Sequence, residues 1–176
     1  MKLFRRKLTI GEFLDALLEI RIDIKKEFQE YIKKKSDFSG DEQLLNMESI
    51  IFSLWVISLT IPSKEYKDML HQKLCDDIGL EGNEIQIFYQ QVNKRYANYN
   101  YAYNKWVANP QCGYLLGSVI TETVVNQNAD FSIQGTLPPT DLLTDSEMFL
   151  FFGESFKTTL EFIKDLKKDY EIPDLR

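Results

Sequence analysis

The chain has 176 residues, of which 44% are hydrophobic and 13% aromatic, and its formal net charge is -6. This composition excludes a disordered chain, because disordered segments lack the apolar side chains that build a core. The length predicts one compact domain over residues 1–176 with a sizeable core. Two cysteines are too few for a disulfide framework, so reduced, buried thiols are expected.

The start of the chain is basic but does not continue as a signal peptide. Four Lys or Arg residues stand among residues 1–7, and Glu12 and Asp15 interrupt the apolar stretch that would have to follow. The most apolar run, residues 50–61, is well short of the roughly 20 residues of a transmembrane helix. We therefore expect a cytoplasmic protein with no transmembrane segment.

Charge is distributed unevenly along the chain. Residues 1–35 hold ten Lys or Arg and six Asp or Glu, whereas the remaining residues hold 11 basic and 21 acidic side chains. An acidic body repels nucleic acid and attracts basic partners. The charge distribution therefore argues against nucleic-acid binding and favours a basic protein partner.

Apolar residues recur at helical spacing along most of the chain, which predicts an all-α fold. A first helix is expected over residues 10–35, where Thr9 and Glu12 form a capping box that satisfies two orphan backbone donors. A second capping box, Ser39 with Glu42, begins a helix that runs to about residue 59. Its apolar character predicts a buried core helix.

The third and fourth helices have clear boundaries in the sequence. Pro62 ends the second helix because it lacks a backbone donor, and Ser63 can cap the third. Gly79 can take the left-handed conformation that closes many helices. The fourth helix is expected from Asn83 to Asn109, before Pro110, with an apolar and aromatic stripe at every third or fourth residue.

The last third of the chain is less regular. Residues 112–125 predict a fifth helix, although Gly113, Gly117 and several β-branched residues leave a strand open. Residues 126–144 are rich in Asn, Asp, Gln, Gly and Pro and predict a long loop, with a functional lid as one interpretation. Thr144 and Glu147 form a third capping box before the sixth helix, and residues 170–176 form a tail. The prediction is a single compact bundle of about six helices.

Two groups of residues could bind a metal ion. Asp68, His71 and Cys75 are spaced so that they share one face of the third helix, which suggests a zinc or iron site. His71 is the only histidine, so a two-histidine di-iron site would need a homo-oligomer to supply a second copy. A buried structural role for His71 and Cys75 is the better interpretation.

Paired carboxylates are the second metal-binding hypothesis. Glu27 with Glu30, and Glu65 with Asp68, each place two acids one turn apart. Two such pairs could hold Mg²⁺ as a cofactor, which is the arrangement of some all-α nucleotide pyrophosphohydrolases. Solvated helix faces produce the same spacing often, so this enzyme hypothesis is an alternative and no cofactor is the main expectation.

The fourth helix supplies the candidate partner-binding residues. Aromatic side chains alternate there with Asn, Lys and Arg, and core packing explains most of them. The candidate contacts for a protein partner are Tyr96, Tyr99, Tyr101, Tyr103 and Trp106.

No phosphate-binding glycine loop and no nucleophile with a recognisable context occurs in the sequence. We therefore expect a non-enzymatic interaction or regulatory domain, such as an acidic inhibitor of a basic protein. A second alternative is a peripheral membrane module that uses the basic arm of residues 1–8, although a free, solvated arm is favoured. The sequence leaves open the partner, the oligomeric state and the order of helix packing.

Overall fold

A computed structural model describes residues 5–35, 42–125, 131 and 146–172. Six α-helices lie in these ranges, which confirms the predicted all-α bundle. No described helix is long and apolar enough to cross a membrane. The elements in chain order are β1 (Arg6–Lys7), α1 (Ile10–Lys35), α2 (Glu42–Leu59), α3 (Lys64–Asp77), α4 (Asn83–Ala108), the 3-10 helix η1 (Pro110–Cys112), α5 (Gly113–Val125), α7 (Ser146–Asp169) and β2 (Tyr170–Glu171).

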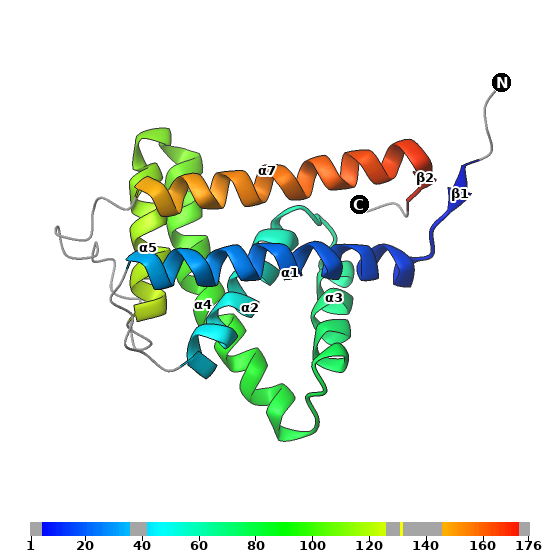
Figure 1. Cartoon of the computed structure of the whole chain (residues 1–176), viewed down its shortest axis with the longest axis horizontal. Coiled ribbons are helices and arrows are strands. Elements are labelled where there is room, and N and C mark those ends of the chain that lie inside the picture. Colours follow the sequence, from blue (N-terminus) through cyan, green and yellow to red (C-terminus); the bar gives the residue numbers. More distant parts are fainter. Residues whose placement is uncertain (1–4, 36–41, 126–130, 132–145, 173–176) are drawn as a thin grey trace.

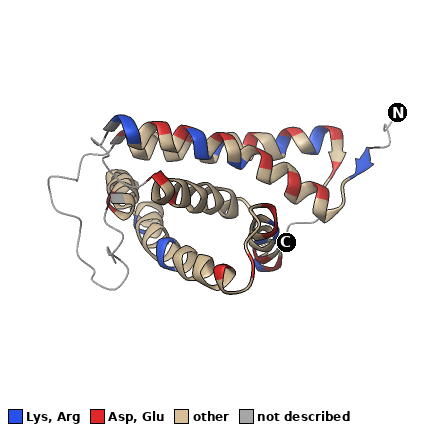
Figure 2. Ribbon diagram, turned by 60° about the horizontal axis from the view of Figure 1, so that its bottom comes forward, with Lys and Arg blue, Asp and Glu red and all other residues tan. Residues whose placement is uncertain are grey.

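The helices form two layers. The long helices α1 and α7 run antiparallel beside one another and cover α2, α4 and α5, as Figures 1 and 2 show. Helix α2 packs chiefly against α1, and α5 packs between α4 and α7. Helix α3 stands apart from the α5 end of the molecule (Figure 1) and reaches α1 through an ion pair of Lys73 with Asp15, whose N–O distance is 2.8 Å.

Helices α1 and α3 begin with capping interactions at the residues that the sequence predicts. The Thr9 backbone N–H donates to Glu12 Oε2 at 2.8 Å, and the Glu12 N–H donates to Thr9 Oγ1 at 3.1 Å, so the first capping box is confirmed. Ser63 caps α3 by accepting from the Tyr66 N–H at 3.5 Å. The backbone after α3 turns at Gly79, whose φ of 72° is the predicted left-handed conformation. Ser39 and Thr144, the first residues of the other two predicted boxes, lie outside the described residues.

Residues 113–125 form helix α5, so the strand alternative does not occur there. Asn109 accepts from the Gln111 N–H at 3.2 Å and begins the short helix η1 that leads into α5. Most of the predicted loop 126–144 lies outside the described residues. Phe131 is described: it is buried, and its N–H donates to the buried Asn98 Oδ1 at 2.9 Å. Asn98 on α4 therefore ties one point of this segment to the core.

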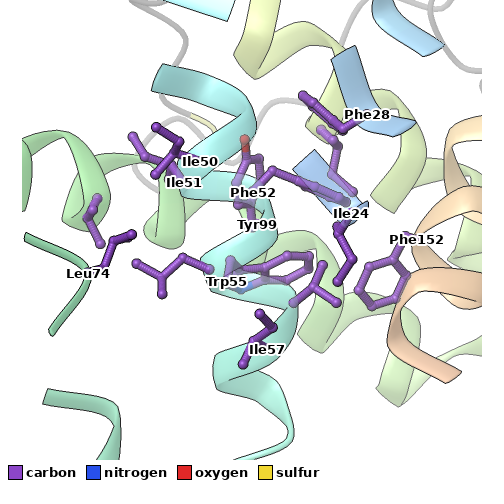
Figure 3. Close-up of a cluster of buried hydrophobic side chains, with 14 of the residues drawn as sticks. Ile24, Phe28, Ile50, Ile51, Phe52, Trp55, Ile57, Leu74, Tyr99 and Phe152 are labelled. Carbon is purple, nitrogen blue, oxygen red and sulfur yellow. The ribbon is translucent and has the colours of Figure 1, made fainter. Parts of the chain in front are cut away.

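Helix α2 is the centre of the hydrophobic core. All of its residues from Glu48 to Ser58 are buried. Phe52 stacks on Phe28 of α1 with ring centroids 4.4 Å apart, and Trp55 packs against Tyr99 of α4 at 5.1 Å. Figure 3 shows these rings meeting around α2, with Phe152 of α7 beside Trp55. The predicted buried helix is confirmed, and helices α1, α4 and α7 pack against it.

A buried ion pair lies in this core. Glu48 of α2 accepts a bifurcated hydrogen bond from the single N–H of Arg95 Nε, at 2.8 Å to Oε1 and 2.9 Å to Oε2, and another hydrogen bond from Arg95 Nη2. The Glu48 and Arg95 side chains are 2% and 1% exposed. Burial raises the pKa of Glu48, and the guanidinium opposes that rise. The pairing joins α2 to α4 and offsets the desolvation of both charges.

The two ends of the described chain are joined, which differs from the expected free arm and tail. Strands β1 and β2 pair in parallel, with Arg6 opposite Tyr170 and Lys7 opposite Glu171. The Leu8 N–H also donates to the Glu171 carbonyl at 3.0 Å. Two-residue strands are too short for sequence periodicity to detect. The basic side chains of residues 5–7 remain exposed beside this pairing.

Replacing Arg95 with Met should lower the free energy of unfolding by about 3–5 kcal/mol, because Glu48 would keep a buried charge without its partner. Replacing Glu48 and Arg95 together with Met should cost much less, since neither charge is then buried. Urea unfolding followed by circular dichroism measures both values. Equal losses in the single and double variants would contradict the coupling of the two charges.

Two glycines should respond oppositely to alanine substitution. A Cβ at Gly113 of α5 would lie 2.8 Å from Phe149 Cζ on α7, whereas a Cβ at Gly153 would meet nothing within 4 Å. Gly113→Ala should therefore cost about 1–3 kcal/mol through overpacking. Gly153→Ala should stabilise by about 0.5–1 kcal/mol through helix propensity. Thermal unfolding compares the two, and stabilisation by both would contradict the close approach of α5 to α7.

Candidate interaction surfaces

His71 and Cys75, predicted as metal ligands, are buried where α3 meets α4. Both ring nitrogens of His71 are engaged: Nδ1 donates to the Lys67 carbonyl at 2.5 Å, and Nε2 lies 3.1 Å from the Tyr96 hydroxyl, from which it then accepts. Asp68 is exposed and pairs with Lys64 at 2.9 Å. Within the described ranges, no group of three or more His, Cys, Asp or Glu side chains could hold a metal ion. The structure therefore does not assemble the metal site predicted from Asp68, His71 and Cys75.

The predicted carboxylate quartet is not assembled either. Glu65 and Asp68 lie along a shallow depression on α3, and the described residues that line it all belong to that helix. Helix α3 meets α1 at Asp15, and Glu27 lies 12 residues farther along α1, or about 18 Å at the rise of an α-helix. Glu27 and Glu30 are exposed there. The spacing within each pair is that of a helix face, but the packing of α3 keeps the pairs from converging.

The predicted partner-binding aromatics of α4 have different environments. Tyr99 is 0% exposed and packs against α2, so it is part of the core and cannot contact a partner; this correction follows from the α2–α4 packing. Tyr96 is partly buried, its hydroxyl faces His71, and burial raises its pKa. Tyr101, Tyr103 and Trp106 are partly exposed, and Lys105 Nζ lies 5.6 Å from the centre of the Tyr101 ring.

Tyr103 and Trp106 join side chains of α7 in an aromatic surface cluster, which we define as Tyr103, Trp106, Phe149 and Phe156. Trp106 contacts Tyr103 at 5.7 Å and Phe149 at 5.4 Å between ring centroids. Phe156 stacks on the buried Phe152, which also contacts Trp106. All four side chains are partly exposed. The sequence pattern identified Tyr103 and Trp106 of α4 as candidate contacts, but it did not predict that Phe149 and Phe156 of α7 lie beside them.

A groove with a volume of about 390 Å³ lies between α1 and α7. The residues of α7 that line it lie on a different face of that helix from Phe149 and Phe156 of the aromatic surface cluster. Ile20 and the buried Ile24 contribute its apolar surface. The buried Ser155 also lines it, and its hydroxyl donates within α7 to the Phe151 carbonyl at 2.9 Å. We call it the acidic groove, and its described lining residues are Ile20, Asp23, Ile24, Glu27, Glu154, Ser155, Lys157, Thr158 and Glu161.

Both sides of the acidic groove carry carboxylates. Asp23 and Glu27 are one turn apart on α1, and Glu154 and Glu161 are two turns apart on α7, so each pair shares a helix face. The single cation among the described lining residues is Lys157, whose Nζ lies 3.8 Å from Glu161 Oε1. Four exposed carboxylates and one ammonium therefore line the described part of this groove. Figure 2 shows acidic positions along both α1 and α7.

Comparisons with known proteins give no further guide to the chemistry of these surfaces. No protein-family model matches the chain, and no curated protein or solved structure matches it.

The contact between α3 and α4 should weaken in mild acid. Burial lowers the pKa of His71 below its ordinary value of about 6.5, so the unfolded chain binds a proton there that the folded chain does not. Stability should therefore fall as the pH drops below about 6.5, by at most about 1.4 kcal/mol per pH unit from this group. Urea unfolding between pH 7 and pH 5 measures the effect. His71→Gln should remove this contribution, and an unchanged pH dependence in the variant would contradict it.

Proposed function

We propose that the protein is a non-enzymatic interaction domain that binds a basic segment of a protein partner in the acidic groove. The observation that carries the proposal is the placement of carboxylates on both sides of the groove, with Asp23 and Glu27 on α1 and Glu154 and Glu161 on α7. Like charges at close range repel one another, and a cation bound between them lowers that repulsion. The site therefore suits Lys or Arg side chains.

The apolar residues of the groove support a peptide ligand over an isolated ion. Long basic side chains bury their methylene stems on apolar surface while their charged ends stay near water or a carboxylate. The partly exposed Ile20 offers such a surface in the groove, and the buried Ile24 lies beneath the same lining. The volume of about 390 Å³ lies at the small end of the usual range for small-molecule pockets. A few inserted side chains of a larger partner fit this size.

The uneven charge of the chain supports the same proposal. Residues 36–176 hold 21 acidic and 11 basic side chains, and long-range attraction would speed the encounter of this part of the chain with a basic partner. Inhibition of a basic enzyme by occupation of its cationic surface is one role for such a domain. The aromatic surface cluster is the second candidate contact, because aromatic anchors are common where interfaces bind most strongly.

Binding of a defined basic peptide tests the proposal. We would use a capped, helix-forming peptide with Leu on one face and Lys on both flanks, and a counterpart with Glu in place of Lys. Glu27→Gln with Glu154→Gln should weaken binding of the Lys peptide about three- to tenfold at low ionic strength, as expected for two exposed charge pairs. The difference should shrink as salt is added. Fluorescence anisotropy of the labelled peptide measures both.

A matched variant controls for the change in net charge. Glu65→Gln with Asp68→Asn removes the same two charges from α3, outside the acidic groove, and should leave binding almost unchanged. Equal weakening by both double variants would mean that only the overall charge matters. Loss of binding in Trp106→Ala with none in the groove variant would move the site to the aromatic surface cluster. Equal affinity for the Lys and Glu peptides would overturn the proposal.

A further inference from the structure

Lys157 is a cation inside an otherwise acidic site. It lies on α7 between Glu154 and Glu161, and it is the one basic side chain among the described residues that line the acidic groove. A bound basic segment would bring further cations into the same small volume. Lys157 therefore opposes the ligand that the other charged side chains attract.

The contact of Lys157 with its own helix is weak. Its Nζ is 3.8 Å from Glu161 Oε1, and the two side chains are 74% and 61% exposed. Other ion pairs of the chain are shorter, at 2.6 Å for Arg6 with Glu12 and 2.8 Å for Lys73 with Asp15. A Lys four residues before a Glu is also the less favourable order on a helix. Glu161 therefore holds Lys157 loosely, and a ligand could replace Lys157 at Glu161 or pair with Lys157 itself.

We propose that Lys157 determines the specificity of the acidic groove, an inference that rests on the proposed binding of a basic segment. The partner it selects places cations over Asp23, Glu27 and Glu154 and an acidic side chain over Lys157. Segments that are basic throughout bind less tightly, because one of their cations meets the Lys157 ammonium. The groove thus selects a charge pattern, which is stricter than selection for net positive charge.

Neutralising Lys157 should tighten binding of the all-Lys peptide. Lys157→Gln should raise its affinity about two- to fivefold at low salt, the range expected for one exposed charge contact. Lys157→Arg keeps the charge and should bind like the wild type. Lys164→Gln removes the same charge from α7 two turns farther on, outside the described lining of the groove, and should change little. Fluorescence anisotropy measures all four proteins, and circular dichroism checks their fold.

A reciprocal substitution tests the selected pattern. A set of peptides, each with one Lys replaced by Glu, should contain one member that binds the wild type at least as tightly as the all-Lys peptide. That peptide should bind the Lys157→Glu variant more weakly than the all-Lys peptide does. The substitution in the protein and the substitution in the peptide together form a double-mutant cycle. If no member shows this reversal, or if Lys157→Gln and Lys164→Gln act alike, Lys157 does not determine specificity. That failure is distinct from failure of the proposed function, in which Glu27→Gln with Glu154→Gln would leave binding unchanged.

Discussion

Helix α2 has no solvated face between Glu48 and Ser58, and this constraint organises the molecule. A helix that is buried all round must be covered on every side, and here α1, α4 and α7 supply the cover. The polar groups of α2 are satisfied within this environment. The hydroxyls of Ser53 and Ser58 donate to carbonyls one turn back at 2.9 and 2.8 Å, and the Trp55 indole donates to Asn100 at 2.9 Å. Glu48 can be buried because Arg95 neutralises it.

The acidic groove follows from the same constraint. The core side chains of α1 and α7, such as Phe28 and Phe152, are directed at α2 and its aromatic neighbours, as the contacts of Phe52 and Trp55 show. The two helices lie beside one another without sharing a wide apolar interface. Tyr31 and Phe151 stack with centroids 6.0 Å apart, and the groove lies between residues 20–27 of α1 and residues 154–161 of α7. Its acidic sides are exposed and screened by water, so the fold tolerates them at little cost.

Sequence periodicity predicted the helices well, because capping and apolar spacing are local properties. The face of α4 that packs into the core was predicted less well, because the structure buries Arg95 together with Phe88 and Ala102. A basic residue at position 95 looks like surface, and only its partner explains its burial. The signal was present: Glu48 continues the buried spacing of Leu45 and Phe52 on α2, and opposite charges on two core stripes suggest a pair.

The groove could not be predicted for a different reason. Asp23 and Glu27 have the spacing of an ordinary solvated helix face, and so do Glu154 and Glu161. What makes them a candidate site is that two separate faces of the same sign lie across one groove, which depends on tertiary packing. Opposite signs across the groove would lower the repulsion between these faces at no cost to the core. The Lys73–Asp15 contact between α1 and α3 shows that this chain does pair opposite charges between helices elsewhere. Across the groove, by contrast, the described residues of α1 and α7 place carboxylates on both sides, and this arrangement is the basis of the proposed binding of a cation from outside the chain.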